Sequence, residues 1–346
     1  MISHNKLDLV ICGNSDRCEH EIVNRTHIVR PTFKTTIEDR KSEMTLALFQ
    51  LGVLIKHARR GDKIFVYYFS TAFLILVYAK LVGAETITHF ISVPIKRIVL
   101  GKVLRTLCAL LSDKRVFYNF TNQRDAMFIF KMHKKSIFMP IGVNIQEFNS
   151  IEVNKVVERK KMNLSEDDFI FLAVGTIHKT RKVEDVVDAF CELSQKHSNI
   201  GLVIAGGGSH YESIKSYIQQ TGNNKIFLTG IVDHSRIVTL CKISDVGITY
   251  YAIEVFNVQP ALKTLEYIAA GLPVIAVNTL GNRFYLENNH MGELINDNKE
   301  SLRIAMEQYL SDNNLVAMQR ENITRCDIKR YDFDHIHESF VGQINF

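Results

Sequence analysis

A lysine and a glutamate three residues apart, Lys263 and Glu266, could bind a charged or hydroxylated ligand. They stand in the stretch NVQPALKTLEYIAAGLPVIAV, residues 257–277. This spacing puts both side chains on one face of a helix, within its first two turns. A carboxylate accepts hydrogen bonds from paired sugar hydroxyls, and a helix N-terminus favours an anion such as phosphate. An amphipathic helix with solvated Glu and Lys explains the stretch equally well, so both interpretations stay open at this point.

A second cluster of basic residues follows a glycine. Gly175 ends the apolar run FIFLAVG, and Thr176, Lys179, Arg181 and Lys182 come after it, ahead of a helical pattern. Ligands of parallel α/β sheets bind beyond the carboxyl ends of the strands, where glycine lets the backbone approach a phosphate. Arginine can hold a diphosphate through two parallel hydrogen bonds. We therefore expect a phosphate-binding loop here.

Two further candidates stand at the ends of other strand patterns. Residues 206–208 close the run LVIAGGG, and Gly207 is a candidate phosphate contact, although a plain turn explains the triplet as well. His89 ends a strand pattern in the first half of the chain and is a candidate substrate contact. A core histidine is its alternative, since a lone histidine at a strand end is weak evidence of function.

Local signals in the sequence position the Lys263–Glu266 pair. Pro260 suits the first position of a helix, and Gly271 suits a left-handed C-cap at its end. The apolar run 272–277 that follows is typical of a strand buried on both faces. The stretch therefore predicts a loop, a helix, a turn and a buried strand in succession.

Strand and helix patterns alternate along the whole chain, which indicates parallel sheets with helices on both faces. We expect a first Rossmann-like domain over residues 1–148 and a second over 149–330, with a charged linker over 140–167. A helix over 331–346 is expected to dock back on the first domain. The expected strands are 7–12, 27–30, 63–69, 85–91, 115–118, 136–139, 169–174, 201–205, 226–229, 246–250 and 272–277. The expected helices are 42–58, 71–82, 95–111, 123–132, 182–197, 210–220, 235–242, 260–270 and 299–311.

Composition is that of an ordinary globular protein, with 46% hydrophobic and 23% charged residues. The six cysteines are scattered without a CxxC pair, which favours reduced thiols in the cytoplasm over disulfides or a metal site. The N-terminus lacks the pattern of a signal peptide. The uncharged run 64–79 is shorter than the roughly 20 residues of a membrane span and is better explained as a strand followed by a buried helix.

Charge is distributed unevenly between the two halves. Residues 1–150 carry 22 Lys and Arg against 12 Asp and Glu, whereas the remainder carries 20 against 25. The first half is therefore expected to meet something anionic. The helix 95–111 carries Lys96, Arg97, Lys102 and Arg105, which are either a solvated face or a contact with anionic lipid headgroups. Nucleic acid is not expected as a partner, because no nucleic-acid-binding motif accompanies these residues.

The second half of the chain resembles the nucleotide-sugar-binding domain of family 4 glycosyltransferases, which have the GT-B fold. The resemblance covers nearly the whole of this half and rests on a series of segments in the family's order, whereas the first half is similar only in outline. The segments are PIGVNIQEF, FLAVGTIHKTRKVEDVVDAF, LVIAGGG, KIFLTGIV, ISDVGITYY and PALKTLEYIAAGLPVIAVNTLGNRFYL.

This resemblance implies two facing Rossmann-like domains and metal-independent, retaining transfer from a nucleotide-diphosphate sugar, with no cofactor. By position, Glu266 would bind the donor ribose, and Arg181 would hold the diphosphate together with Lys182 and the backbone of Thr176. His89 would contact the transferred sugar. Further donor contacts implied by position are Gly175, Gly207, Lys263, Gly281 and Asn282.

Three departures from the family pattern limit what the resemblance implies. Val258 occupies the position of the first residue of the family's acidic pair, so its role would be absent or taken by Glu254, Asn257 or Gln259. Thr176 stands where many members have arginine, which leaves the diphosphate more dependent on Arg181. The glycine-rich loop that opens the first domain in the family is missing in recognisable form.

The sequence predicts a cytoplasmic glycosyltransferase, associated with the inner face of the plasma membrane, that extends a glycan or lipid-linked acceptor in cell-surface polysaccharide synthesis. A non-catalytic GT-B partner of a transferase complex is one alternative, motivated by Val258 and the altered first loop. A sugar-nucleotide epimerase of the same fold is the other. The donor sugar, acceptor, linkage and oligomeric state are left open by the sequence.

Overall fold

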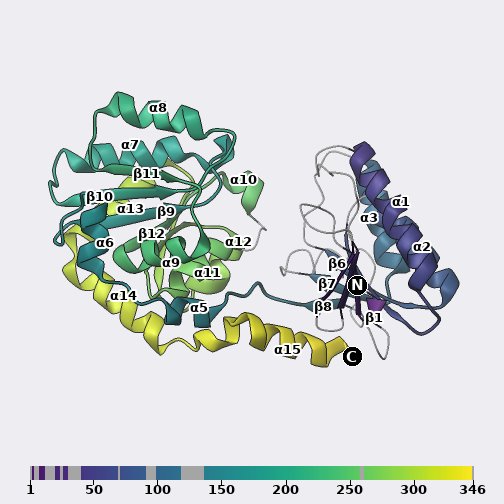
Figure 1. Cartoon of the computed structure of the whole chain (residues 1–346). Helices are drawn as coiled ribbons and strands as arrows, with labels where there is room; N and C mark the ends of the chain where they lie inside the picture. The colour runs from purple at the N-terminus through teal and green to yellow at the C-terminus, as the bar shows by residue number, and fades with distance from the viewer. Residues whose placement is uncertain are drawn as a thin grey trace. The chain divides into compact units, whose positions relative to one another are not determined.

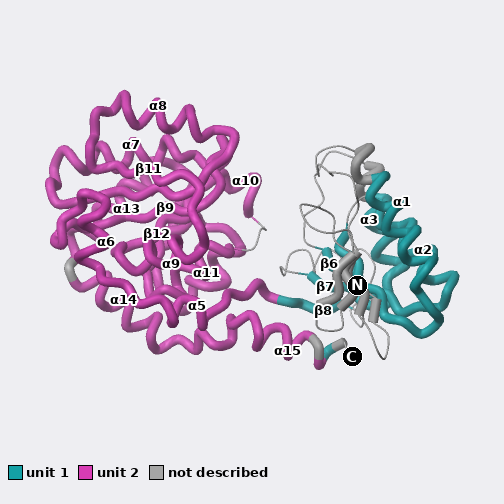
Figure 2. Tube along the Cα trace, viewed as in Figure 1, with its two compact units in different colours: residues 1–139, 343–346 teal, residues 140–342 magenta. Residues whose placement is uncertain are grey.

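The computed structural model of the chain forms two compact units. It describes residues 2–3, 8–11, 20–23, 26–29, 40–68, 71–90, 99–117, 136–257 and 261–344. The first unit comprises residues 1–139 with 343–346, and the second comprises 140–342 (Figure 2). The boundary lies before the expected residue 148, because the backbone of Val143 pairs with Tyr331 and Phe333 inside the second unit.

The first unit contains one mixed sheet, in the order β3-β4-β2-β1-β5-β6-β7-β8. Its part from β5 to β8 is parallel, as the alternating pattern predicts. The pairs β1–β2, β1–β5 and β3–β4 are antiparallel, which the pattern did not predict. The strands are β1 (Ile2–Ser3), β2 (Asp8–Ile11), β3 (His20–Val23), β4 (Thr26–Val29), β5 (Lys63–Tyr67), β6 (Glu85–Phe90), β7 (Lys114–Phe117) and β8 (Ser136–Phe138).

Three helices pack beside this sheet: α1 (Arg40–His57), α2 (Ala72–Val82) and α3 (Val99–Leu111). The uncharged run 64–79 is divided between β5 and α2, as expected. Helix α2 is followed by Gly83, which adopts the left-handed conformation. Among the described residues, no helix is both long and apolar enough to span a membrane. The expected helix 123–132 lies outside the described residues.

The second unit is a doubly wound domain with a fully parallel sheet of order β11-β10-β9-β12-β13-β14 (Figure 1). Its strands are β9 (Phe169–Val174), β10 (Ile200–Ala205), β11 (Ile226–Gly230), β12 (Val246–Thr249), β13 (Val274–Val277) and β14 (Gly292–Ile295). The strands β10, β12 and β13 are buried along their whole length, as expected for apolar runs covered on both faces. β14 was not predicted, because GELI lacks a continuous apolar run.

Two hydrophobic cores lie on opposite faces of this sheet. One face is covered by α7 (Val183–Ser194), α8 (Tyr211–Thr221) and α13 (Lys299–Ser311). The other is covered by α5 (Ile145–Ser150), α9 (His234–Ile243), α11 (Leu262–Ala269), α12 (Leu280–Leu286) and α14 (Asn313–Arg325). The strand order reverses direction between β9 and β12, and a crevice at the carboxyl ends of those two strands is where ligands of such sheets bind.

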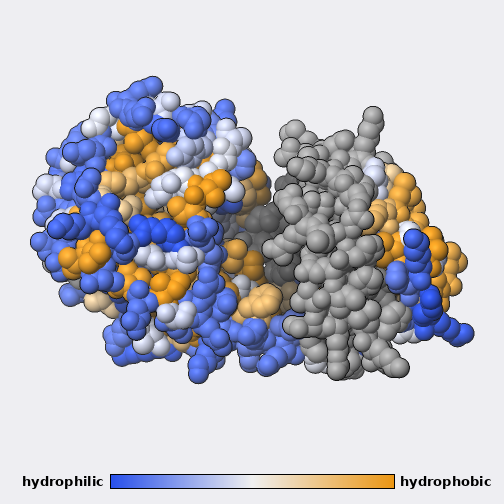
Figure 3. Space-filling model, in the orientation of Figure 1, coloured by the Kyte–Doolittle hydropathy of each residue, from blue (hydrophilic) through white to orange (hydrophobic). Residues whose placement is uncertain are grey.

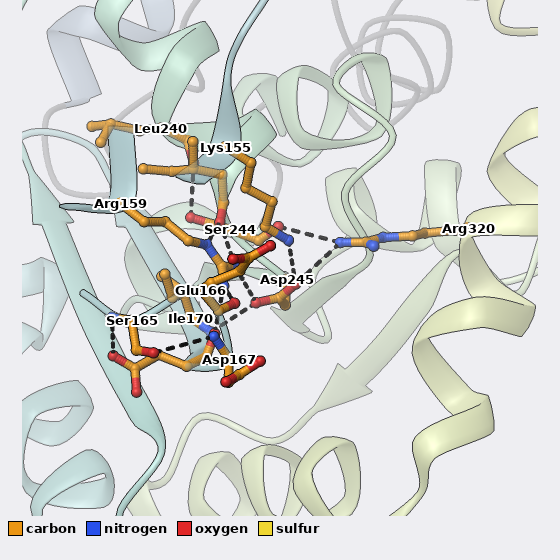
Figure 4. A network of polar contacts seen from close by, with 12 residues as sticks. Lys155, Arg159, Ser165, Glu166, Asp167, Ile170, Leu240, Ser244, Asp245 and Arg320 are labelled. Carbon is orange, nitrogen blue, oxygen red and sulfur yellow. Dashed lines mark hydrogen bonds and ion pairs between the residues drawn. The ribbon is translucent and has the colours of Figure 1, made fainter. Parts of the chain in front are cut away.

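The interpretation of residues 140–167 as a linker is wrong, because this segment is folded into the second unit. It contains α5 and α6 (Lys155–Lys161). Arg159 of α6 is only 2% exposed and donates to the carbonyl oxygens of Ile243, Glu166 and Asp168 (Figure 4). A buried arginine costs free energy unless its donors are satisfied. Its acceptors are Glu166 within this segment and Asp168 and Ile243 outside it, which ties the segment to the rest of the unit.

Asp245 completes this network at the amino end of the sheet. One of its carboxylate oxygens accepts from Arg159 Nη2 at 2.8 Å and from the backbone of Ile170 at 2.9 Å. The other faces Lys155 Nζ at 3.1 Å and Arg320 at 3.5 Å. The network joins α6, β9, β12 and α14 at the end of the sheet opposite to the crevice.

The C-terminal segment forms α15 (Phe333–Ile344). Ile336 and Phe340, two of its expected apolar contacts, are buried, whereas Phe333 is 59% exposed. The last residues, from Gln343, are grouped with the first unit (Figure 2). Docking of this helix on the first domain stays a prediction.

We expect Asp245→Ala to lower the free energy of unfolding of the second unit by about 3–5 kcal/mol, because it leaves the buried Arg159 guanidinium without its carboxylate. Asp245→Asn keeps an acceptor and is expected to cost less. Asp167→Ala, an exposed aspartate drawn in the same network, is the control. Urea unfolding followed by circular dichroism measures all three, and equal stability of Asp245→Ala and Asp167→Ala would contradict the assignment.

Candidate functional site

A small cavity lies at the carboxyl ends of β9 and β12, where the topology predicts a ligand. It measures about 50 Å³ and is lined by the β9 loop, by Thr249, Tyr250 and Tyr251 after β12, and by Arg181 and Lys263. That volume suits a few water molecules. A larger ligand would therefore rest on the loops around the cavity, with only a small part inside it.

Tyr267 fixes the helix of the Lys263–Glu266 pair to the sheet. Its ring fills the space where a side chain at Gly247 would stand, since a Cβ there would lie 2.5 Å from the ring. Its hydroxyl accepts from the Val174 N–H at 2.8 Å and lies 3.3 Å from the Leu172 carbonyl oxygen. Helix α11 is therefore attached at the point where β9 ends and the Gly175 loop begins.

Helix α11 ends as predicted and begins two residues later than Pro260, which lies outside the described residues. Gly271 has a φ of +76°, the left-handed conformation expected of the C-cap region. At the other end, the N-cap residue is Ala261, whose side chain cannot accept a hydrogen bond from the first turn. Within the described part of the chain, the first turn of α11 therefore has no side-chain cap, and its N–H groups suit an anionic ligand.

The Lys263–Glu266 pair lies on α11 on one face, as the spacing predicts. Lys263 Nζ stands 2.6 Å from Glu266 Oε2, and the glutamate is 4% exposed. His234, at the start of α9, places Nε2 at 3.8 Å from Glu266 Oε1, while its Nδ1 lies 2.8 Å from Glu147. Glu266 is therefore a buried carboxylate that lies between the Lys263 ammonium and the His234 imidazole.

Arg181 is oriented by aromatic rings. Its guanidinium carbon lies 4.2 Å from the centre of the Phe256 ring and 5.1 Å from that of Tyr251. Its Nε is buried, and no acceptor among the described residues lies within hydrogen-bonding distance. Burial lowers the pKa of Arg181 from its usual value, although a guanidinium remains charged at neutral pH. Arg181 is thus a cation at the crevice that lacks an anionic partner in the described part of the chain.

Lys182 is engaged inside the protein. It adopts a φ of +45°, which is rare for a residue with a side chain, and its ammonium is paired with Asp297. The other oxygen of Asp297 accepts from the Ile253 N–H at 2.8 Å. A diphosphate would have to compete with Asp297 for Lys182, so Arg181 is the more available cation of this loop.

Gly175 and Thr176 lie where the sequence places them. Gly175 has a φ of +158°, and a Cβ built on it would point into open space. A ligand can therefore approach its backbone closely. Thr176 is exposed beside it. These two residues and Arg181 belong to one loop at the mouth of the cavity.

The glycines at 206 and 208 are required because their backbone packs closely against the backbone of the Gly175 loop. Neither a plain turn nor phosphate binding is needed to explain them. A Cβ on Gly206 would lie 1.8 Å from the Gly175 carbonyl oxygen, and one on Gly208 would lie 2.4 Å from that of Ile177. At Gly207 the space is occupied by the Ile231 side chain. The triplet thus holds the Gly175 loop in position, and donor binding by Gly207 stays a prediction.

Asn282 lies beneath the surface. It is fully buried, and its amide donates to the Val277 carbonyl at 2.7 Å and to the Tyr251 hydroxyl at 3.0 Å. Its oxygen accepts from Thr264 at 2.6 Å. Because these hydrogen bonds occupy the amide, the Asn282 side chain supports Tyr251. It could contact the nucleotide-sugar only if some of these bonds broke. Gly281 precedes it in the first turn of α12.

Two of the three candidate substitutes for the family's first carboxylate lie on or beside α10 (Ile253–Phe256). Glu254 is exposed in this short helix. Asn257, also exposed, accepts from the Leu280 N–H through its backbone carbonyl at 2.9 Å. Val258 and Gln259 lie outside the described residues. A catalytic role for Glu254 or Asn257 stays a prediction.

His89 is a buried residue of the first unit. It is 5% exposed in β6, beside the ring of Tyr67 at 5.3 Å. Burial lowers the pKa of His89 from 6.5 to about 4. The imidazole is therefore neutral at physiological pH and could meet a sugar only as a neutral hydrogen-bonding group.

Sequence reasoning missed Tyr251, Phe256 and His234. The pair of tyrosines that ends ISDVGITYY was an available signal, because aromatic residues at a strand's carboxyl end stand beside the crevice. No local signal marks Phe256 or His234, since the charged residues they contact lie far away in the sequence: Arg181 for Phe256, and Glu147 and Glu266 for His234. Among the described residues, no group of three or more His, Cys, Asp or Glu side chains is arranged as metal ligands.

Comparison with known proteins identifies a family for the second half of the chain. Residues 154–325 match the model of the family described as glycosyl transferases group 1. The alpha-monoglucosyldiacylglycerol synthase of Acholeplasma laidlawii is 25% identical over 183 residues, which cover 52% of this chain and 45% of that protein. The chain spans about half the length of the curated relatives it matches.

Solved structures show the same two-domain fold. Sucrose-phosphate synthase from Thermosynechococcus elongatus superposes with a TM-score of 0.74 at 15% identity, covering 97% of this chain and 87% of that one. The Anabaena protein HepE, solved in complex with UDP-glucose, gives 0.73 at 12% identity, covering 92% and 86%. The chain therefore has the GT-B fold that its sequence predicts.

The neutral, buried His89 predicts a loss of stability in mild acid. Below pH 6.5 the unfolded chain takes up a proton that the folded chain refuses until about pH 4, so stability falls as the pH decreases through this window. We expect a loss of about 2 kcal/mol from this residue between pH 7.5 and 5.0. Urea unfolding of wild type and His89→Asn at both pH values measures it, and an equal loss in both proteins would contradict the burial of His89.

Proposed function

We propose, for a chain whose residues 154–325 belong to the glycosyl transferases group 1 family, that it transfers a sugar from a nucleotide-diphosphate sugar to a glycan or lipid-linked acceptor. One observation carries this proposal. Arg181 presents a positive charge at the crevice of the second sheet, and its buried Nε lacks an acceptor among the described residues. Leaving a charged donor without an acceptor costs free energy that a bound anion would offset.

The diphosphate and the ribose of a nucleotide-diphosphate sugar each have suitable groups at this crevice. The diphosphate is assigned to Arg181, the Gly175–Thr176 backbone, Lys263 and the uncapped first turn of α11. The buried Glu266 carboxylate is assigned to the ribose hydroxyls. Because HepE of the same fold was solved with UDP-glucose, a UDP-sugar is the first donor to test.

The reaction requires charge stabilisation at the leaving group. As the bond between the anomeric carbon and the diphosphate breaks, negative charge grows on the diphosphate, and fixed cations stabilise it without having to reorganise. Arg181 and Lys263 supply those cations, which supports transfer without a metal ion. Retention of anomeric configuration is proposed from the family resemblance, with Glu254, Asn257 and the neutral His89 as candidate contacts of the transferred sugar.

An acceptor at a membrane is supported by the outer face of the first unit. Eight large apolar side chains on its three helices are more than 40% exposed, which is unusual for neighbouring helices of a soluble surface. They are Met44, Leu48 and Ile55 on α1, Val77 and Leu81 on α2, and Val103, Leu107 and Leu110 on α3. Part of this outer apolar face is visible as the orange region of the first unit in Figure 3.

The contact expected from the basic residues of the predicted helix 95–111 is only partly described. Lys96 and Arg97 lie outside the described residues, as does the side chain of Lys102. The guanidinium of Arg105 lies over the rings of Tyr68 and Phe90, at 5.3 and 5.1 Å. We therefore propose that the outer apolar face inserts among the lipids of the inner leaflet of the plasma membrane, with basic side chains of α3 meeting the anionic headgroups.

Two other functions make different predictions for the same site. A non-catalytic GT-B partner would bind a nucleotide and transfer no sugar to any acceptor. A sugar-nucleotide epimerase would isomerise or hydrolyse the donor in the absence of an acceptor, which product analysis detects. Cations at the diphosphate position suit both enzymes, because hydrolysis and transfer each release the nucleotide diphosphate; a turnover that depends on added acceptor separates the transferase from the epimerase.

Removing either of the two central charges is expected to weaken donor binding. A thermal-shift screen against UDP, GDP, ADP and CMP first identifies the nucleotide, because a ligand selective for the native state raises its melting temperature. We expect Arg181→Ala and Glu266→Ala to reduce that shift and to lose at least about tenfold in donor turnover, as loss of a charge-assisted contact implies.

The control for these variants is Arg283→Ala, an exposed arginine paired with Glu287 on α12. Wild-type turnover in both Arg181→Ala and Glu266→Ala would overturn the assignment. The same assay with EDTA tests the metal-independent transfer, which is wrong if turnover stops and returns only with added Mg²⁺ or Mn²⁺. The anomeric configuration of the product, read by NMR, tests retention.

The membrane contact is tested by flotation with vesicles. Leu81→Asp combined with Leu107→Asp places two charges in the outer apolar face, and we expect binding to vesicles of phosphatidylglycerol and phosphatidylcholine to fall at least about fivefold. Ile304→Asp, an exposed apolar residue of α13 in the other unit, is the control. If the double variant floats like wild type while Lys102→Gln with Arg105→Gln does not, the contact is purely electrostatic and the outer apolar face is not inserted.

A further inference from the structure

The short helix α10 is joined to the Arg181 loop by more contacts than its four residues would suggest. The Ala252 N–H, at its start, donates to the Thr180 carbonyl at 2.9 Å. Asp297 connects the two segments a second time, because it pairs with Lys182 and accepts from the Ile253 N–H. The loop that carries Arg181 and the helix that carries Phe256 are therefore held together at two points.

Two aromatic rings at this junction form one surface, which we name the aromatic corner: Tyr251 and Phe256. Their ring centres lie 4.9 Å apart with an angle of 56° between the planes. Tyr251 is 4% exposed and receives a hydrogen bond from the buried amide of Asn282. Phe256 is half-buried and completes the corner from α10. The Arg181 guanidinium lies against both rings.

Aromatic rings hold a guanidinium differently from a carboxylate. A carboxylate would occupy its N–H donors and cancel its charge, whereas a ring attracts the cation through its face and leaves the N–H groups at the edge for another acceptor. The buried Arg159 of the same domain shows the contrast, because its donors are taken by carbonyl oxygens and by Asp245. The aromatic corner thus orients Arg181 without neutralising it.

We infer that Phe256 is a positioning residue for the diphosphate of the donor: it holds Arg181 against Tyr251 so that the free edge of the guanidinium faces the ligand. This inference rests on the proposed function, since it assigns Phe256 to the site where the diphosphate is proposed to bind. Holding the side chain in advance reduces the conformational entropy lost on binding. Phe256 itself touches no part of the ligand in this assignment.

Isothermal titration with UDP and with uridine tests the inference. We expect Phe256→Ala to weaken UDP binding about three- to tenfold, the range of a partly buried cation–π contact, and to leave uridine binding unchanged. In an Arg181→Ala background, Phe256→Ala is expected to have no further effect on UDP. Val255→Ala, an exposed neighbour on the same helix, is the control. Equal weakening of UDP and uridine, tighter UDP binding, or a full effect without Arg181 would each overturn it.

A second measurement separates this inference from the proposed function. Phenylglyoxal modifies accessible guanidinium groups, and mass spectrometry gives the rate at Arg181 in the absence of any nucleotide. We expect faster modification of Arg181 in Phe256→Ala than in wild type or Val255→Ala, because the side chain is released from the rings. Equal rates in Phe256→Ala and wild type would overturn the positioning role even if UDP binds. A faster rate in Phe256→Ala, found together with no nucleotide binding by wild type, would confirm that Phe256 positions Arg181 and would reject a diphosphate as the ligand.

Discussion

The contact of the Tyr267 ring with Gly247 determines where the charged groups of the second domain stand. The ring occupies space on β12 that only a glycine leaves free, and its hydroxyl reaches the last residue of β9. Helix α11 is thereby held across the two strands at which the sheet reverses its order. Glu266, the residue before Tyr267, is buried beside that junction, and the Gly175 loop starts from the same strand end. A shift of this helix would move the carboxylate and the loop relative to each other.

Two arginines in the second domain show how the surroundings of a charge indicate its role. Arg159 lies at the amino end of the sheet, and its donors are satisfied by backbone carbonyls and Asp245. Such an arrangement stabilises the fold and leaves nothing for a ligand. Arg181 lies at the carboxyl end, where aromatic faces hold it and its Nε lacks an acceptor among the described residues. An unneutralised cation is costly to retain for stability alone, which is why we assign it to an anion.

The sequence was sufficient for features that depend on local pattern. Parallel alternation in the second domain, the buried strand β13 and the left-handed Gly271 follow from apolar periodicity and from the conformational preference of glycine. Side-chain partners distant in the sequence could not be predicted, because no pattern encodes them. The contact of Asn282, expected at the ligand, with Tyr251 and that of Lys182, expected at the diphosphate, with Asp297 are examples. The strands β1 and β3, which form the antiparallel pairs of the first domain, were missed because two and four residues are too short to leave a periodic signal.

The central claim is that one crevice of the second domain holds a nucleotide diphosphate between Arg181 and Glu266. A crystal structure of the protein with UDP, or with whichever nucleotide raises its melting temperature most, tests this most directly. We expect a phosphate oxygen within hydrogen-bonding distance of the Arg181 guanidinium, which remains against Phe256, and the ribose hydroxyls on Glu266. A nucleotide bound elsewhere, with Arg181 and Glu266 in their present contacts, would contradict it.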